Sequence, residues 1–322
     1  MLADVRGLDA FWELGTGRRQ GGMCMAERML IDTLGLGLEQ VLTYLRRENP
    51  DYPAFQAWVI ETAGRPDPVT LARYHNWLDG LPPPEAVQRQ LDAIDAAPPV
   101  LDADDLAHWE REGYVILRNA VTADEAAAAA DLLWRTLGAS PGDPETWYAE
   151  LPGGIMVQHF QGEAMEAPRR SGRVHKAFAQ LWGTADLWHL VDRLSFNPPV
   201  RPDYRFRATG IHWDVSIAPP IPFSTQGILY LTDTAADQGA LQLVPGFHHR
   251  LAGGWLDGLG DANPREVDFS TEAVTVGAGA GDLVIWRSEL PHGASPNRAR
   301  RPRLAQYVTM YATDLVANPV WI

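Results

Sequence analysis

The chain has 322 residues, 46% of them apolar, which is enough for one large packed domain or for one domain with an appendage. Its 27 basic and 41 acidic side chains give a net charge of −14, which argues against nucleic-acid phosphates or an anionic membrane surface as the main partner. The apolar runs stay below the length of about 18 residues that a membrane-spanning helix needs, and the N-terminus lacks the basic-then-apolar order of a signal peptide. We therefore expect a soluble, cytoplasmic protein whose partner is a small molecule, and its single cysteine excludes an internal disulfide.

Residues 1–95 are predicted to form a helical N-terminal extension. Apolar residues recur there at intervals close to the 3.6-residue period of a helix. The predicted helices cover residues 27–47, 69–78 and 85–94. Two alanines and two prolines at 96–99 follow, and adjacent prolines stop a helix and stiffen a connection. We therefore place a domain boundary here and a second domain over residues 100–322.

The second domain opens with a helix and a strand. The pattern predicts a helix over residues 102–112, which Gly113 ends, and a strand over residues 114–118. Thr122 and Glu125 stand three residues apart and predict a capping box for an alanine-rich helix that follows.

Residues 139–172 are rich in proline, glycine and charge, apart from a strand-like run at 155–160. We expect this segment to be a long surface excursion, and long loops on a rigid scaffold often cover a binding site. Gln158 and His159, in the strand-like run, are our candidates for substrate contacts.

The rest of the chain is dominated by β patterns. A predicted helix over residues 173–182 and a predicted strand over residues 187–197 come first, and short apolar runs separated by turn residues follow. These runs cover residues 227–232, 240–244, 273–276, 282–287 and 304–311. Short strands spaced in this way predict a sandwich or barrel, and a jelly roll closes the edges of this number of strands. The predicted fold class is α+β, with a jelly-roll core flanked by helices.

Three side chains have the spacing of a metal site. His212 and Asp214 stand two apart, and on an extended strand such residues point to the same face. A second imidazole, His292, follows after a series of predicted strands. Two histidines and one carboxylate leave one face of an octahedral metal open, which suits non-haem Fe(II) that must also hold a co-substrate and O₂.

These motifs, taken in order, resemble the phytanoyl-CoA dioxygenase family of Fe(II)/2-oxoglutarate-dependent oxygenases. The resemblance is carried by His212-x-Asp214, by residues 239–248, and by His292-Gly293 with Asn297 and Arg303 behind it. It extends upstream through residues 112–118 and 182–199, and covers about residues 100–315 in all. The resemblance implies a cupin-like double-stranded β-helix, and it does not reach the first 95 residues.

The resemblance also implies roles for individual residues. His212, Asp214 and His292 are expected to bind iron, and Arg303 to anchor the distal carboxylate of 2-oxoglutarate, because a guanidinium meets a carboxylate with two parallel bonds. Ser195 and Asn197 are expected to help hold the co-substrate. Where some members carry a hydroxyl, two residues after the second histidine, this chain has Ala294.

The implied function is a dioxygenase that uses Fe(II), 2-oxoglutarate and O₂ to hydroxylate an unactivated C–H bond of a small molecule. In related halogenases a small residue stands in place of the carboxylate, so Asp214 favours hydroxylation or another oxidation over halogenation. Two alternatives remain open: a metal-dependent β-barrel enzyme that works without 2-oxoglutarate, and a non-catalytic metal-binding module. Asp192 and Arg193 are equally well interpreted as a structural ion pair or as part of the site.

Overall fold

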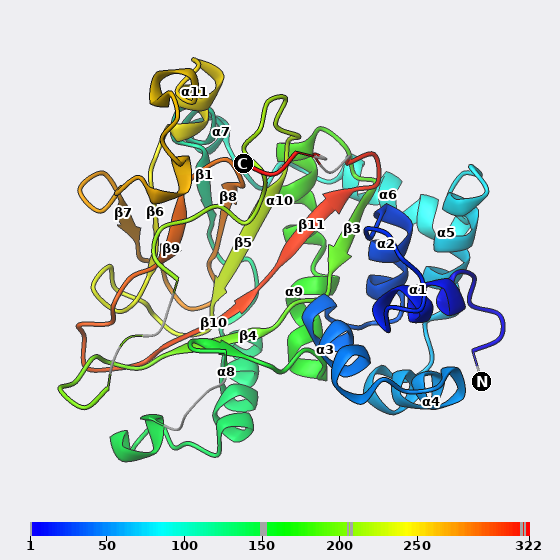
Figure 1. Cartoon of the computed structure of the whole chain (residues 1–322). Helices are drawn as coiled ribbons and strands as arrows, with labels where there is room; N and C mark the ends of the chain where they lie inside the picture. Colours follow the sequence, from blue (N-terminus) through cyan, green and yellow to red (C-terminus); the bar gives the residue numbers. More distant parts are fainter. Residues whose placement is uncertain (1, 149–152, 205, 207–208, 316–317, 319) are drawn as a thin grey trace.

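A computed structural model describes residues 2–148, 153–204, 206, 209–315, 318 and 320–322 (Figure 1). The helices are α1 (Leu8–Gly15), α2 (Met25–Thr33), α3 (Leu38–Glu48), α4 (Tyr52–Ala63), α5 (Pro68–Leu78), α6 (Glu85–Ala96), α7 (Ala103–Glu112), α8 (Ala123–Leu137), α9 (Glu163–Arg170), α10 (Gly172–Trp182) and α11 (Phe247–Ala252). Short 3-10 helices are η1 (Pro144–Tyr148), η2 (Asp257–Leu259) and η3 (Pro264–Glu266). The strands are β1 (Tyr114–Leu117), β2 (Met156–Val157), β3 (Leu187–Leu190), β4 (Leu194–Asn197), β5 (Thr225–Tyr230), β6 (Leu241–Leu243), β7 (Val274–Val276), β8 (Leu283–Arg287), β9 (His292–Ala294), β10 (Arg303–Tyr307) and β11 (Thr309–Ala312).

The strands form the jelly-roll core of an α+β protein, as expected. A six-stranded antiparallel sheet has the order β1-β8-β5-β10-β4-β2, and a three-stranded sheet has the order β7-β6-β9. A third, two-stranded sheet pairs β11 with β3, and these strands adjoin β10 and β4 of the large sheet along the chain. Strands far apart in the sequence are therefore neighbours, which is typical of a double-stranded β-helix.

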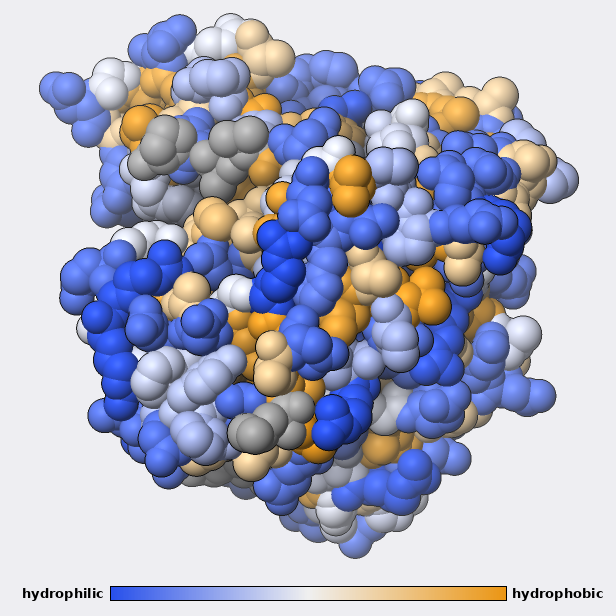
Figure 2. Space-filling model, turned by 90° about the vertical axis from the view of Figure 1, so that its right-hand side faces the viewer, coloured by the Kyte–Doolittle hydropathy of each residue, from blue (hydrophilic) through white to orange (hydrophobic). Residues whose placement is uncertain are grey.

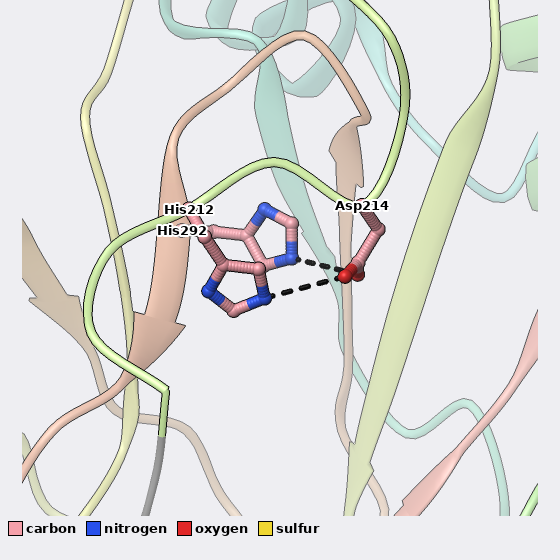
Figure 3. A group of neighbouring side chains, drawn as sticks. All are labelled: His212, Asp214 and His292. Atoms are coloured by element: carbon pink, nitrogen blue, oxygen red, sulfur yellow. Dashed lines mark hydrogen bonds and ion pairs between the residues drawn. The ribbon is translucent and has the colours of Figure 1, made fainter. Parts of the chain in front are cut away.

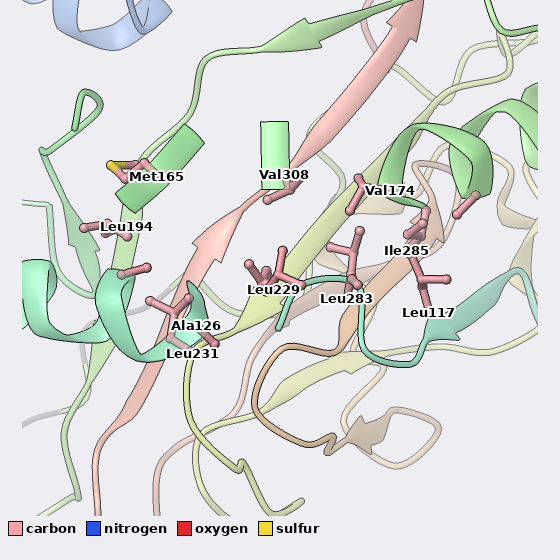
Figure 4. Close-up of a cluster of buried hydrophobic side chains, with 14 of the residues drawn as sticks. Leu117, Ala126, Met165, Val174, Leu194, Leu229, Leu231, Leu283, Ile285 and Val308 are labelled. Atoms are coloured by element: carbon pink, nitrogen blue, oxygen red, sulfur yellow. The ribbon is translucent and has the colours of Figure 1, made fainter. Parts of the chain in front are cut away.

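Both faces of the large sheet are covered by other parts of the chain. Successive side chains of a strand point to opposite sides, so neighbouring residues pack in different apolar clusters. In β5, Ile228 and Tyr230 join an apolar cluster shared with the three-stranded sheet, whereas Leu229 joins the cluster under the helices. Leu283 and Ile285 of β8 lie on the helix side as well, together with apolar residues of α8 and α10 (Figure 4). Full burial of each such side chain contributes about 1.5–3 kcal/mol, so the sheet is a rigid support for the residues on its inner face.

The N-terminal helices α1 to α5 pack around an apolar cluster of their own, beside the two-stranded sheet (Figure 1). This cluster includes Trp188 of β3 and Tyr311 of β11, so the helical extension and the jelly roll share apolar packing. Polar contacts join the same parts: the buried Asp32 accepts hydrogen bonds from the Val191 amide and from the Tyr311 hydroxyl, both at 2.8 Å. Viewed from the side of the extension, the surface is mostly hydrophilic (Figure 2).

Several sequence predictions are confirmed in this part of the fold. Helices α5, α6, α7, α8 and α10 and strand β1 lie where the patterns place them. Thr122 and Glu125 form the expected capping box, in which the Thr122 amide donates to the Glu125 carboxylate at 2.8 Å. None of the helices described is both long and apolar enough to cross a membrane.

The single helix predicted over residues 27–47 is wrong, because the chain breaks between Thr33 and Leu38. Gly35 adopts a left-handed backbone with a φ of 70°, which ends α2, and α3 then starts in a new direction. Leu34 and Leu36 in the break are buried, so the apolar pattern continues through a turn and imitates one helix.

The segment 139–172 is not the open excursion that its composition predicts. It contains η1, β2 and α9, and Phe160 and Met165 are buried in it, while residues 149–152 lie outside the described part. Helix α9 was missed because it holds Pro168 and several charges and starts at Gly162. The predicted strand at 155–160 shrinks to the two residues of β2.

Two predicted strands each divide into two. Residues 187–197 form β3 and β4, and residues 304–311 form most of β10 and β11. In both cases the chain bends and the second half pairs in a different sheet, as the pairing of β10 with β4 and of β11 with β3 demonstrates. An alternation of apolar residues gives no sign of such a change of sheet.

The polar link between the extension and the jelly roll yields a stability prediction. Asp32→Ala is expected to lower the free energy of unfolding by about 3 kcal/mol, because it leaves the Arg28 guanidinium and the buried Val191 amide without an acceptor. Urea denaturation followed by tryptophan fluorescence measures this loss. Glu48→Ala, on the exposed end of α3, is the control and should change the free energy by less than about 0.5 kcal/mol. Equal effects of the two variants would contradict the prediction.

Candidate active site

His212, Asp214 and His292 come together at one end of the jelly roll. His292 begins β9, whereas His212 and Asp214 lie in the connection before β5 and not on a regular strand, so the strand predicted for them is wrong. Their proximity has a different cause: an isolated antiparallel bridge joins His212 to His292, with the amide of each donating to the carbonyl of the other at 2.9 Å. The bridge places the two imidazoles side by side, with ring centroids 5.0 Å apart.

The three side chains present one ligand atom each to a common point (Figure 3). These atoms lie within 4.8 Å of one another, and each Nε2 is 3.2 Å from the Asp214 carboxylate. The Nδ1 of His212 contacts the Gly210 carbonyl at 2.7 Å, and the Nδ1 of His292 contacts the Leu290 carbonyl at 3.0 Å. Since a carbonyl only accepts, both Nδ1 atoms carry a proton. Without a metal each Nε2 can also hold a proton and donate to Asp214, and loss of that proton frees its lone pair for a metal.

The electrostatics of the three residues suit a cation. Burial opposes ionisation of Asp214, but the hydrogen bonds from His212 and His292 outweigh it and hold the pKa of Asp214 well below its usual value. The hydrogen bond between His212 and Asp214 also raises the pKa of His212. The carboxylate is therefore ionised at neutral pH, and the pair of imidazoles faces a fixed negative charge.

Two further side chains hold Asp214 in place. Gln226 of β5 donates through Nε2 to the carboxylate at 2.6 Å. Arg265 of η3 donates to the carbonyls of Trp213 and Val215, which flank Asp214, each at 2.8 Å. Trp213 itself is buried, and its indole N–H donates to the Glu289 carbonyl. Residues 213–215 are not part of a β-sheet, so these side-chain hydrogen bonds fix the segment in place of sheet hydrogen bonds.

A cavity of about 440 Å³ opens beside the three residues. Its polar lining comes from both domains of the predicted organisation and includes Glu39, Asp192, Arg193, Thr209, Gln226, Arg303, Tyr307 and Thr309. Its apolar lining includes Ile155, Met156, Ile228, Leu241 and Trp286. Arg303, Tyr307 and Thr309 stand at alternate positions along the chain and line the same cavity, whose size is typical of small-molecule sites.

Arg303 is a buried charged residue in the wall of the cavity. Its side chain is 1% exposed, and all three guanidinium nitrogens lack a hydrogen-bond partner among the described residues. An unpaired buried charge is costly, so a native protein keeps one where a ligand supplies the partner. A carboxylate that enters the cavity would meet this fork with two parallel bonds. The donor set thus fits both a divalent metal and a dicarboxylate.

The other predicted contacts lie away from the described cavity lining. Ser195 and Asn197 are fully buried in β4, and they donate to the carbonyls of Ile155 and Ser295, both at 3.0 Å. Gln158 is exposed and lies 3.5 Å from Glu39, and His159 is half-buried. Their roles at a ligand stay predictions.

Ala294 does line the cavity, whereas the neighbouring Ser295 hydroxyl donates to the Ala240 carbonyl. Sequence reasoning missed Glu39, Gln226 and Arg265. Glu39 belongs to a helix outside the recognised motifs, and neither Gln226 nor Arg265 belongs to a motif with a characteristic spacing. For Arg193 the only signal was its pairing with Asp192, which was left open between a structural and a site role.

A jelly roll with two histidines, a carboxylate and a buried guanidinium around one cavity defines the class of Fe(II)/2-oxoglutarate-dependent enzymes. The chain belongs to the phytanoyl-CoA dioxygenase family, whose profile matches residues 109–305, more than half of the chain. Enzymes of this family use Fe(II), 2-oxoglutarate and O₂, and these are the cofactors that the donor set of this chain fits.

Two relatives are similar to part of this chain. The chain is 28% identical over 144 residues to dioxygenase cdmD of Talaromyces verruculosus, a match that covers 43% of this chain and 44% of the relative. It is 24% identical over 97 residues to a phytanoyl-CoA dioxygenase-like protein of Dictyostelium discoideum, with 28% of each chain covered. The matched segments thus span less than half the length of both relatives.

The chain is also similar to solved structures. EvdO2 of Micromonospora carbonacea var. aurantiaca is 21% identical, with 68% of this chain and 94% of that one covered and a TM-score of 0.49. The 2-oxoglutarate-dependent epimerase SnoN of nogalamycin biosynthesis is 20% identical, with coverage of 71% and 86% and a TM-score of 0.48. EctD of S. alaskensis is 19% identical, with coverage of 69% and 84% and a TM-score of 0.48.

The support that Arg265 gives to Asp214 yields a prediction about metal binding. Arg265→Ala is expected to weaken Fe(II) binding about tenfold or more, because groups that orient ligands have effects of this size. Anaerobic calorimetric titration of the metal-free protein measures the affinity. Arg250→Ala, which removes an exposed ion pair with Glu272, is the control and should bind Fe(II) like the parent. An unchanged affinity in Arg265→Ala would mean that the segment keeps its shape without these bonds.

Proposed function

We propose that this protein is an Fe(II)/2-oxoglutarate-dependent dioxygenase that hydroxylates an unactivated C–H bond of a small molecule. The observation that carries the proposal is the buried guanidinium of Arg303, which has no hydrogen-bond partner in the described part of the chain and lines the same cavity as His212, Asp214 and His292. A metal site alone has no need for such a group, whereas a dicarboxylate co-substrate bound at the metal does.

Each residue has a defined task in this proposal. His212, Asp214 and His292 would hold Fe(II) through Nε2, a carboxylate oxygen and Nε2, and Arg303 would bind the distal carboxylate of 2-oxoglutarate. When bound, iron and 2-oxoglutarate together supply the oxidation of a C–H bond by O₂, with conversion of 2-oxoglutarate to succinate and CO₂. The chain fixes the geometry of the ligands and leaves the remaining positions open.

The cavity walls serve the same reaction by limiting water. Ile228, Leu241 and Trp286 present apolar surface beside the ligands, and Trp286 lies with its ring centroid 5.1 Å from that of His292. Removal of water strengthens the interaction between Arg303 and a carboxylate and protects a reactive centre. As the third protein ligand, Asp214 would take the position that a halide needs, which favours hydroxylation over halogenation.

The proposal predicts an ordered pair of binding events. Anaerobic addition of Fe(II) and then 2-oxoglutarate to the metal-free protein is expected to produce the charge-transfer absorption of the chelated co-substrate. Arg303→Ala should need at least about tenfold more 2-oxoglutarate for the same absorption, because it loses a charge-assisted bidentate contact. Arg303→Lys, which keeps the charge without the fork, should fall between the two. Asp214→Ala should weaken binding of the metal itself.

The same titration separates this proposal from its rival. Binding of Fe(II) with no absorption change on addition of 2-oxoglutarate would contradict the proposal and favour a metal-dependent barrel that works without this co-substrate. Absorption followed by oxidation of a bound small molecule, with succinate formed in equal amount, would support hydroxylation or a related oxidation.

A further inference from the structure

A cluster of three charged side chains lines the cavity apart from the metal ligands. Arg193, just before β4, donates through Nε to Asp192 at 3.1 Å and pairs through Nη1 with Glu39 of α3. The Arg193 guanidinium also lies 5.2 Å from the centre of the Phe160 ring. Glu39, Asp192 and Arg193 are named here the rim cluster, and all three line the cavity.

Residues of the N-terminal extension and of α9 both hold this cluster in place. Glu39 comes from α3, and Asp32 of α2 accepts the amide hydrogen of Val191, the residue before Asp192. From the other side, Arg169 donates to the carbonyls of Asp192 and Phe160 at 2.7 and 3.0 Å. The rim cluster is therefore held in place and belongs to the wall of the cavity, not to a freely moving surface.

The charges of the cavity do not balance. The charged residues described in its lining comprise the carboxylates of Glu39, Asp192 and Asp214 and the guanidiniums of Arg193 and Arg303. Fe(II) and doubly ionised 2-oxoglutarate together add no net charge, and the two histidines are neutral when they bind a metal. One negative charge is left over, and it belongs to the rim cluster, where two carboxylates share one guanidinium.

A leftover negative charge in a partly closed cavity attracts a cation, because the low-dielectric walls weaken screening. Glu39 is half-exposed and Asp192 is 26% exposed, and both line the cavity. Their carboxylates accept from Arg193, and that of Glu39 also accepts from Gln158, yet neither is sealed from a ligand in the cavity. Met156, the first residue of β2, pairs with Ser195 of β4, and together with the preceding Ile155 it supplies apolar surface to the same cavity. An acyl-CoA thioester is disfavoured, since its phosphates would meet uncompensated carboxylates.

We propose that the substrate is a small molecule with a protonated amine, which the carboxylates of Glu39 and Asp192 bind while its apolar part lies against Ile155 and Met156. The assignment rests on the proposed function, because iron and 2-oxoglutarate set the charge that remains. The helical extension then takes part in the choice of substrate through Glu39, far in sequence from the metal ligands.

Simple probes test this assignment without turnover. The full chain, loaded anaerobically with Fe(II) and saturating 2-oxoglutarate, is titrated by calorimetry with hexylammonium, 1-hexanol or hexanoate, which share one apolar chain. Hexylammonium is expected to bind about fivefold or more tighter than 1-hexanol, and hexanoate more weakly than either, in line with the strength of a partly exposed ion pair. The saturating co-substrate keeps hexanoate away from Arg303.

Variants then assign the preference to the rim cluster. Glu39→Gln and Asp192→Asn, made separately, should each reduce hexylammonium affinity about fivefold and leave the affinity for 1-hexanol unchanged. Glu48→Gln, at the far, exposed end of α3, is the matched control and should bind all three probes like the parent.

Each outcome has a distinct meaning. Equal affinity for hexylammonium and 1-hexanol, tighter binding of hexanoate, or no binding of hexylammonium would overturn the assignment. A preference for hexylammonium that survives in both rim variants would also overturn it. The charge-transfer absorption of each sample, recorded before the probe is added, separates these results from failure of the proposed function, which would abolish the absorption in the parent.

Discussion

The candidate site depends on one short interaction, the pair of backbone hydrogen bonds between His212 and His292. One partner begins a strand of the small sheet, and the other lies in a segment with no regular ladder of its own. The bridge therefore joins the least regular part of the domain to one of its ordered parts, and the carboxylate of Asp214 follows two residues later. Arg265 and Gln226 complete the support, the first through backbone carbonyls and the second through the carboxylate. The bridge is thus the direct contact that brings together two imidazoles 80 residues apart in sequence.

The sheets set where the second half of the site lies. Arg303, Tyr307 and the apolar Ile228 belong to adjacent strands of the large sheet, and strict alternation sends them inward while Leu229 and Leu304 pack under the helices. A guanidinium with no hydrogen-bond partner among the described residues is tolerated here because the surrounding layers are well packed and offset the cost of one unsatisfied charge. Stability of the core and readiness of the site are thus linked: apolar burial on one face of the sheet offsets the desolvated cation on the other.

The sequence predicted what depends on local spacing and failed where tertiary contacts decide. The capping box at Thr122 and the terminator Gly113 are local signals, and both appear in the structure. The same reasoning joined α2 to α3, because Leu34 and Leu36 are buried in a turn and imitate a helical stripe. It placed His212 and Asp214 on a strand, since residues two apart share a face of an extended strand, whereas the chain uses an isolated bridge. Glu39 and Arg265 had no local signal at all, because their importance arises only when distant segments meet.

The interlocking of the helical extension with the jelly roll has a consequence for how such enzymes diverge. Glu39 reaches the cavity from a helix that lies outside the matched family profile, while the candidate metal ligands and Arg303 lie inside it. A substitution of Glu39 therefore changes the wall of the cavity and leaves the candidate metal ligands and Arg303 unchanged. The sequence that forms this part of the cavity wall and the sequence that supplies the candidate metal ligands can therefore change separately.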